Sequence, residues 1–437
     1  MKHTQPEREH KREREHRRAP GTARGTPIVS AVVVWTAVGA ALVLGACAED
    51  PLSLEPDDAP GAATITREEF LPAAELPDWR DTTISGFVRR TTASFVVVAI
   101  EEGFQSRTLM RFDVPDTIMT FADTLPVDHF DSASFTVSID QAFSEFAEFP
   151  ATFRLVGLAQ AFDAETATWS EAGDSAAWAM PGGDLTTEIA AGELADEEGS
   201  VELTFSVDAD SLLKSWQELD GGPGVALMFD GAEAFVRIPS VVLHIEPVLE
   251  GREVPVRQDL APVDRTFITD PPFPPTGTEL RVGGVPGSRA YFQFTMPDTI
   301  AGVPLRGSTV NHAELILQPL PAADSAWVVR QGLNVRQVAL LADPWELGAR
   351  TPVGASSAAG VRLTPDLLAE STPLTLNLTA IVANAAAGGP VTIRIGVRPD
   401  PVGQELGFVS FGSVESEGEL APVIRVVLSP PPVFGLP

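Results

Sequence analysis

Residues 106–118, SRTLMRFDVPDTI, recur as residues 288–300, SRAYFQFTMPDTI, and this repeated stretch decides the fold. Seven of its thirteen positions are identical without a gap. Other features recur in the same order at a similar offset. They are a strand after Ala133 and after Ala313, Trp169 and Trp345, Gly221-Gly222-Pro223 and Gly388-Gly389-Pro390, and Pro239 and Pro422 before a last strand. The chain is therefore predicted to be a tandem duplication.

Inside each repeat, hydrophobic and polar side chains alternate with a period of two. The clearest examples are residues 135–139 and 201–207 in the first repeat, and 374–378 and 393–397 in the second. This period indicates strands that bury one face. Several such strands between Gly and Pro turns predict an all-β fold with two tandem antiparallel, jelly-roll-like β-sandwiches. One short helix is expected in each repeat, over residues 208–216 and 379–384.

Composition excludes several classes of protein. The 437 residues include 60 acidic and 30 basic side chains, for a net charge of −30. Nucleic-acid binding is not expected, because phosphate contacts need Lys and Arg. The chain has one cysteine, which excludes an intramolecular disulfide and a cysteine-based zinc cluster.

The N-terminus has the pattern of an export signal. Residues 1–27 hold eight Lys or Arg and four Glu, and an uncharged apolar stretch follows over residues 28–46. Such a stretch is also long enough for an uncleaved membrane helix. Its end, Leu44-Gly45-Ala46-Cys47, resembles the lipobox of bacterial lipoproteins, where the cysteine receives lipid before the signal is removed. A cysteine placed there by chance is the alternative.

The lipobox resemblance implies a location. Cys47 would carry an acyl anchor such as palmitate, which binds the protein to a membrane of the cell envelope. Ala48 follows the cysteine in place of Asp, which favours the outer membrane; whether the protein faces the periplasm or the cell surface is left open.

Composition also predicts the domain boundaries. Residues 47–80 are rich in Pro, Ala, Asp and Glu, and the Pro run at 271–275 cannot lie inside a sheet. The expected order is a signal peptide over 1–46, a tether over 47–80, a first module over 81–248, a linker over 249–276, a second module over 277–431 and a tail over 432–437.

The order of motifs resembles the DNRLRE-type domains of secreted bacterial proteins, which are β-sandwiches related to a carbohydrate-binding module family. The matching segments are 107–113, 169–171, 205–216 and 239–245 in the first repeat, and 289–295, 345–346, 376–379 and 422–428 in the second. Ser206 and Asn377 stand where that family has Asp, which puts a role for that carboxylate in doubt. The resemblance implies a non-catalytic module that binds polysaccharide.

No catalytic residue is predicted from the sequence. Beyond the export signal the histidines are His129, His244 and His312, with no pair at metal-ligand spacing, and His244 is expected on the outward face of its strand. The acidic stretches 195–198 and 415–419 are interpreted as soluble surface and not as calcium ligands. We therefore expect no metal and no cofactor.

Three tryptophans are candidates for glycan binding, because sugar rings stack on exposed aromatic faces. Trp178 is the first choice, since it lies in a loop and has no counterpart in the second repeat. Trp169 and Trp345 recur at equivalent places, which also fits a structural role at the ends of the sandwiches.

The expected function is that of a lipid-anchored, non-catalytic cell-envelope protein with a binding or structural role that involves extracellular polysaccharide. Two alternatives stay open. One is a polysaccharide-degrading enzyme with a carboxylate site, and the other is a purely structural partner of another envelope protein.

Overall fold

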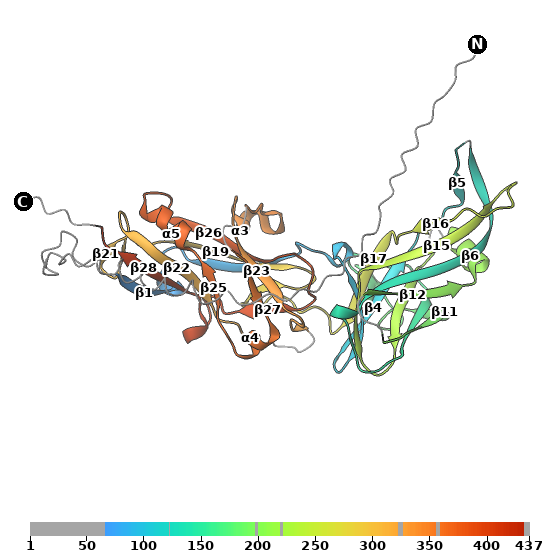
Figure 1. Ribbon diagram of the computed structural model, residues 1–437, viewed down its shortest axis with the longest axis horizontal. Coiled ribbons are helices and arrows are strands. Elements are labelled where there is room, and N and C mark those ends of the chain that lie inside the picture. Colours follow the sequence, from blue (N-terminus) through green and yellow to red (C-terminus); the bar gives the residue numbers. More distant parts are fainter. Residues whose placement is uncertain are drawn as a thin grey trace, which may run out of the picture. The chain divides into compact units, whose positions relative to one another are not determined.

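The computed structural model describes residues 66–431, apart from 122, 197–199, 219–221, 322–326 and 355–358. The predicted signal peptide, Cys47 and the predicted tail lie outside the described residues. The described part consists mostly of antiparallel strands in two β-sandwiches (Figure 1), as the all-β prediction required. Within it, no helix has the length and apolar character needed to cross a membrane.

The first sandwich pairs a longer sheet with a more polar one. The longer sheet runs β11 (Leu185–Leu194), β8 (Ala151–Leu158), β13 (Val225–Asp230), β4 (Phe104–Arg111) and β17 (Asp264–Asp270), with β3 (Val96–Glu101), β14 (Ala234–Ile238) and β7 (Glu145–Phe146) joined to it through β4. The polar sheet runs β12 (Ser200–Val207), β6 (Thr124–Asp140), β15 (Ser240–Leu249) and β16 (Gln258–Leu260), with β5 (Thr117–Met119) beside β6. The predicted helix is α2 (Ala209–Glu218), and β9 (Glu171–Gly173) pairs with β10 (Ala176–Ala177) in a long loop.

The second sandwich repeats this plan. One sheet runs β24 (Val361–Leu363), β23 (Leu333–Ala339), β26 (Thr392–Pro399), β19 (Ser288–Thr295) and β2 (Arg80–Ser85), with β18 (Leu280–Gly283) and β27 (Phe408–Phe411). The other runs β1 (Arg67–Pro72), β28 (Val423–Ser429), β22 (Thr309–Leu317) and β25 (Leu374–Asn377). Besides the predicted helix α5 (Thr379–Ala386), the second repeat holds two short helices that were not predicted, α3 (Pro344–Leu347) and α4 (Pro365–Ala369), and the strand pair β20 (Thr299–Ile300) and β21 (Val303–Pro304).

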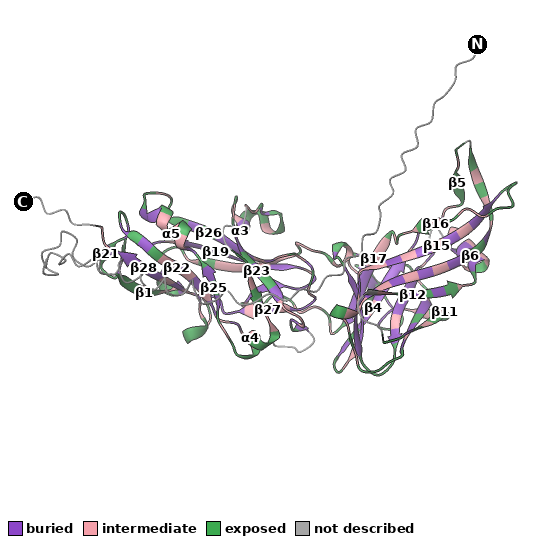
Figure 2. Ribbon diagram, viewed as in Figure 1, coloured by how far each residue is buried: buried purple, intermediate pink, exposed green. Residues whose placement is uncertain are grey.

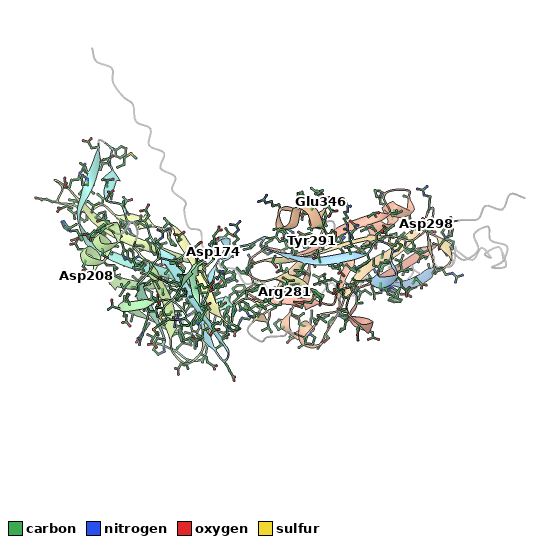
Figure 3. All side chains as sticks on the ribbon, turned by 180° about the vertical axis from the view of Figure 1, so that it is seen from behind. Asp174, Asp208, Arg281, Tyr291, Asp298 and Glu346 are labelled. Carbon is green, nitrogen blue, oxygen red and sulfur yellow. The ribbon has the colours of Figure 1, made fainter. Side chains whose placement is uncertain are left out.

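Alternation along the strands builds the cores, and Figure 2 shows buried residues alternating with intermediate ones along β15 and the second half of β6. Phe135 of β6 is fully buried, whereas Thr136 faces outward. Helix α2 closes this core with Trp216, whose ring lies with its centroid 6.3 Å from those of Phe112 and Phe135. In the second sandwich Tyr291 of β19, labelled in Figure 3, is fully buried.

The N-terminal arm, which we define as residues 67–85 with β1 and β2, belongs to the second sandwich. β1 pairs with β28 and β2 pairs with β19, so the blue strand β1 lies among orange and red strands in Figure 1. Between them the ring of Trp79 stacks on Phe294, with 5.2 Å between centroids. The sequence predicts a tether over residues 67–80 and assigns residues 81–85 to the first module. The boundary differs because both strands lie at sheet edges and carry charged residues that conceal the period of two.

The middle arm, residues 258–270 with β16 and β17, completes the first sandwich although it lies inside the predicted linker. β17 pairs with β4 over its whole length and buries Phe267 and Ile268. The Pro run that follows contacts β18, where the buried Arg281 (Figure 3) donates hydrogen bonds to the carbonyl oxygens of Pro274 and Pro275. In chain order the first sandwich is thus inserted between β2 and β18 of the second.

Candidate functional site

The outward face of the sheet β12-β6-β15-β16 forms a polar hollow of about 570 Å³. Strand β6 contributes a row of hydroxyl groups, from Ser132, Ser134, Thr136 and Ser138. The neighbouring strands add Glu202 and Thr204 on one side, and Ser240, Val242, His244 and Glu246 on the other, with Arg257 at the margin. We call this set of residues the polar hollow.

The strand register explains why these side chains gather. On β6 every second residue from Ala133 to Ile139 is buried, so the residues between them point outward together. Ser134 lies directly opposite His244 on β15 and opposite Ser206 on β12. Because side chains of directly opposed residues share a face, the hydroxyls form cross-strand rows.

His244 links three strands through its imidazole ring. Its Nδ1 lies 2.6 Å from Oδ1 of Asp259 on β16, and its Nε2 lies 3.1 Å from Oγ1 of Thr136 on β6. Arg257 Nε donates to the same Asp259 oxygen at 3.3 Å. The hydrogen bond from His244, aided by that from Arg257, holds the pKa of Asp259 below its ordinary value. His244 therefore lies on the outward face, as predicted, and is fixed there on both ring nitrogens.

Further hydrogen bonds order the rest of the hollow. Ser132 Oγ donates to Glu246 Oε2 at 2.7 Å, and Ser240 Oγ donates to Ser138 Oγ at 2.9 Å. Each hydroxyl both donates and accepts, so these groups keep lone pairs or protons free toward solvent. The hollow is a pre-ordered surface of donors and acceptors.

The chain Asp259–His244–Thr136 has the connectivity of a carboxylate–imidazole–hydroxyl relay. With the Nδ1 proton on the Asp259 side, Nε2 accepts from the Thr136 hydroxyl and could withdraw its proton. Acyl transfer also needs donors aimed at the developing oxyanion. Around Thr136 the backbone of β6 is paired on both sides, with β12 and with β15, so its N–H groups are used within the sheet. Backbone N–H groups of β6 therefore do not supply an oxyanion hole beside Thr136.

Trp178 does not present an exposed ring, contrary to the expectation from the sequence. Its side chain is 6% exposed, and Nε1 donates to the carbonyl oxygen of Thr168 at 3.0 Å. It packs in an apolar cluster with Leu109, Phe162 and Ile268. The long loop that holds β9 and β10 folds over the outer face of the β4–β13 sheet, and Trp178 fills the space between loop and sheet. A solvent-facing sugar platform at this residue is not compatible with that burial.

Trp169 and Trp345 are half-buried, and a guanidinium lies over each ring. Cζ of Arg107 lies 4.8 Å from the ring centre of Trp169, and Cζ of Arg80 lies 4.4 Å from that of Trp345. A sugar that stacked on the covered face would have to displace the arginine. These contacts favour the structural interpretation of both residues, and none of the three tryptophans lines the polar hollow.

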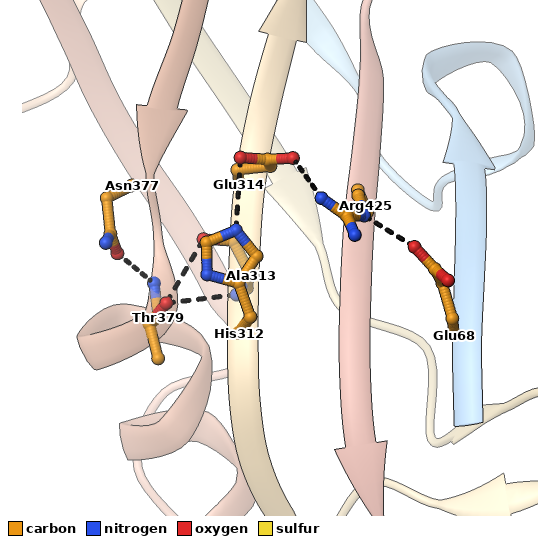
Figure 4. Close-up of polar contacts among 7 residues, drawn as sticks. All are labelled: Glu68, His312, Ala313, Glu314, Asn377, Thr379 and Arg425. Carbon is orange, nitrogen blue, oxygen red and sulfur yellow. Dashed lines mark hydrogen bonds and ion pairs between the residues drawn. The ribbon is translucent and has the colours of Figure 1, made fainter. Parts of the chain in front are cut away.

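The corresponding sheet of the second sandwich carries a ladder of ion pairs in place of free hydroxyls (Figure 4). Arg425 of β28 contacts Glu314 of β22 at 2.9 Å and Glu68 of β1 at 2.6 Å. His312 Nε2 lies 3.1 Å from Glu314. Burial raises the pKa of Glu314, but hydrogen bonds from Arg425 and His312 outweigh it and lower that pKa. The ladder satisfies its own charges and holds the N-terminal arm.

Within the described residues, no group of three or more His, Cys, Asp or Glu side chains is placed to hold a metal ion. Neither a family model nor a curated protein sequence matches the chain. The polar hollow is not among the sites predicted from the sequence. In the sequence the site is visible as the outward hydroxyls of residues 132–138, but such a row on one strand indicates only a solvated face. The site forms when the register places three strands side by side.

Proposed function

We propose that this protein is a lipid-anchored, non-catalytic component of a bacterial cell envelope, and that its first sandwich binds an extracellular polysaccharide in the polar hollow. The observation that carries the proposal is the row of β6 hydroxyls beside the ordered His244–Asp259 pair. The motif order that resembles DNRLRE-type domains supports the same class of ligand. The lipobox at Cys47 supports the anchor.

The chemistry of the hollow matches a chain of sugar rings. Sugar hydroxyls need partners that both donate and accept hydrogen bonds, and the hydroxyls of Ser and Thr do both. The Glu202 carboxylate adds an acceptor, and the Arg257 guanidinium adds donors. Val242 places an apolar patch between the polar rows, where a C–H face could rest. The volume of about 570 Å³ lies within the roughly 300–1,000 Å³ of small-molecule sites.

Titration calorimetry tests the proposal. Residues 64–437, which form one compact unit, are titrated with xylohexaose, cellohexaose and chitohexaose. For a glycan that binds, His244→Ala and Thr136→Val should each weaken affinity about tenfold, which corresponds to about 1.4 kcal/mol. The matched control is His312→Ala, which removes a carboxylate-paired histidine from the equivalent sheet and should leave affinity unchanged.

Two results would overturn the polar hollow as the site. One is equal loss of affinity in the His244 and His312 variants, and the other is full affinity in the Thr136 variant. Failure of every glycan to bind would favour the purely structural role. Release of shorter sugars, lost in Glu202→Gln, would favour a glycosidase that uses paired carboxylates.

A further inference from the structure

The two arms occupy equivalent places in the two sandwiches, with the same register. In the second sandwich Ile84 of β2 lies opposite Arg289 of β19. In the first sandwich Ile268 of β17 lies opposite Arg107 of β4. Arg107 and Arg289 are equivalent residues of the repeat, so both arms bind their sheets at matching positions.

The arms are exchanged with respect to the repeats. The N-terminal arm directly precedes the first repeat, yet it completes the second sandwich through β28 and β19. The middle arm directly precedes the second repeat, yet it completes the first sandwich through β15 and β4. If each arm docked on the repeat that it directly precedes, that arm and that repeat would form one continuous sandwich. The chain therefore contains a reciprocal strand exchange between its two halves.

Charged residues on the arms favour the pairing of each arm with one particular sandwich. Asp264 of the middle arm lies opposite Arg111, and Arg111 Nε donates to its carboxylate at 2.7 Å. Arg80 is the equivalent residue of the N-terminal arm and lies opposite the neutral Gln293. If the N-terminal arm entered the first sandwich, Arg80 would face Arg111. Like charges directly opposed on a sheet are destabilising, so this pairing is disfavoured.

We propose that the N-terminal arm also docks on the second sandwich of another copy of this chain, which gives a strand-exchanged dimer. The exchanged form uses the same hydrogen bonds and the same buried residues as the closed form. Both arm strands lie at sheet edges, so each pairs with its sandwich along one side, and partial unfolding of that sandwich would release the arm for exchange. Residues 86–279, a whole sandwich with its linker, separate the arm from the rest of the second sandwich along the chain, so a second copy can supply the same arm without a change of fold.

Cysteine cross-linking tests the exchange. Ser85 Oγ of the N-terminal arm lies 2.8 Å from Ser288 Oγ of β19, so a disulfide between these positions reports docking. In residues 64–437, which lack the native cysteine, Ser85→Cys protein is mixed with Ser288→Cys protein, unfolded partially in urea, returned to buffer and oxidised. The expected product is a covalent dimer that holds one chain of each variant.

Two controls make every outcome decisive. Ser85→Cys mixed with Ser215→Cys, an exposed position on α2, measures random cross-linking, and the proposal requires at least tenfold more heterodimer than this pair gives. The double variant with cysteines at 85 and 288 should form the bond within one chain. Bonding within one chain but not between chains would overturn the exchange. Absence of both bonds would overturn the docking of β2 on β19 itself.

Discussion

Because Trp178 is buried, its removal should lower the stability of the protein and not weaken glycan binding. Trp178→Ala should lower the free energy of unfolding by about 3–5 kcal/mol, because the ring fills the space between the long loop and the sheet. Urea denaturation of residues 64–437 measures this loss, and Trp178→Phe should restore much of it. A variant with parental stability and weakened glycan binding would return the residue to the sugar-binding surface.

Two carboxylates should make opposite contributions to the pH dependence of stability. Burial raises the pKa of Asp81 although Trp79 Nε1 at 3.0 Å and the amide of Val414 at 2.8 Å donate to it. A raised pKa means that the folded state holds this proton more tightly than the unfolded chain. The stability from Asp81 is therefore fully present below the unfolded pKa of about 3.8 and is lost as pH rises through the folded pKa.

Asp81→Asn should accordingly raise the melting temperature at pH 7 and remove the loss of stability between pH 4 and the folded pKa of Asp81. Asp259→Asn is the matched comparison. Its lowered pKa gives stability that is present above its unfolded pKa and lost as pH falls through the folded pKa. Melting scans from pH 3 to pH 8 distinguish the two, and profiles of the same sign would contradict this assignment.

At the scale of elements, the sequence predicted the strands that bury one face and missed those that lie at edges. Residues 133–139 of β6, 201–207 of β12, 374–377 of β25 and 392–395 of β26 alternate, and the helices α2 and α5 follow strands at equivalent places, so pattern alone located them. In β2 no residue is fully buried, and in β1 charged residues occupy the first half. Such strands are held by backbone pairing, which leaves no hydrophobic period to detect.

The candidate site also depends on strand pairing, so the sequence pattern did not predict it. Outward hydroxyls on one strand predict only solvent exposure, and the hydrogen-bond partner of Thr136, His244, lies 108 positions further along the chain. His244 was placed on the correct face, but the contact with Asp259 required β16, which lies in the predicted linker. Long-range register, which a single sequence does not reveal, assembles the polar hollow.

The inserted topology predicts which fragments fold. Residues 277–431 lack both strands of the N-terminal arm and should not melt cooperatively, because β28 and β19 lose their partners and Phe294 loses Trp79. Residues 66–86 joined to residues 277–431 by a Gly/Ser linker should restore a cooperative transition in calorimetry. Cooperative melting of 277–431 alone would show that the arm is dispensable. In the same way 81–248 should require extension to residue 270.

At the scale of the whole molecule, the order of the chain relates the proposed anchor to the proposed ligand site. Nineteen residues lie between Cys47 and Arg67, the first residue of β1, so the chain reaches at most about 70 Å between them when fully extended. The first described strand after the proposed anchor belongs to the second sandwich, which also holds both ends of the described part of the chain. The inserted first sandwich carries the polar hollow.

The anchor itself gives the last prediction. If Cys47 accepts lipid, its thiolate must form a thioether, and a serine hydroxyl is a much weaker nucleophile for that step. Cys47→Ser should therefore abolish incorporation of labelled palmitate in a bacterial host and leave a precursor that keeps residues 1–46, as mass spectrometry of the isolated protein would show. Ala48→Ser, next to the modified residue, is the matched control and should be processed normally. Complete processing of the Cys47→Ser protein, with release of a soluble chain, would show that an ordinary signal peptidase removes the leader, and the polar hollow would then belong to a secreted protein.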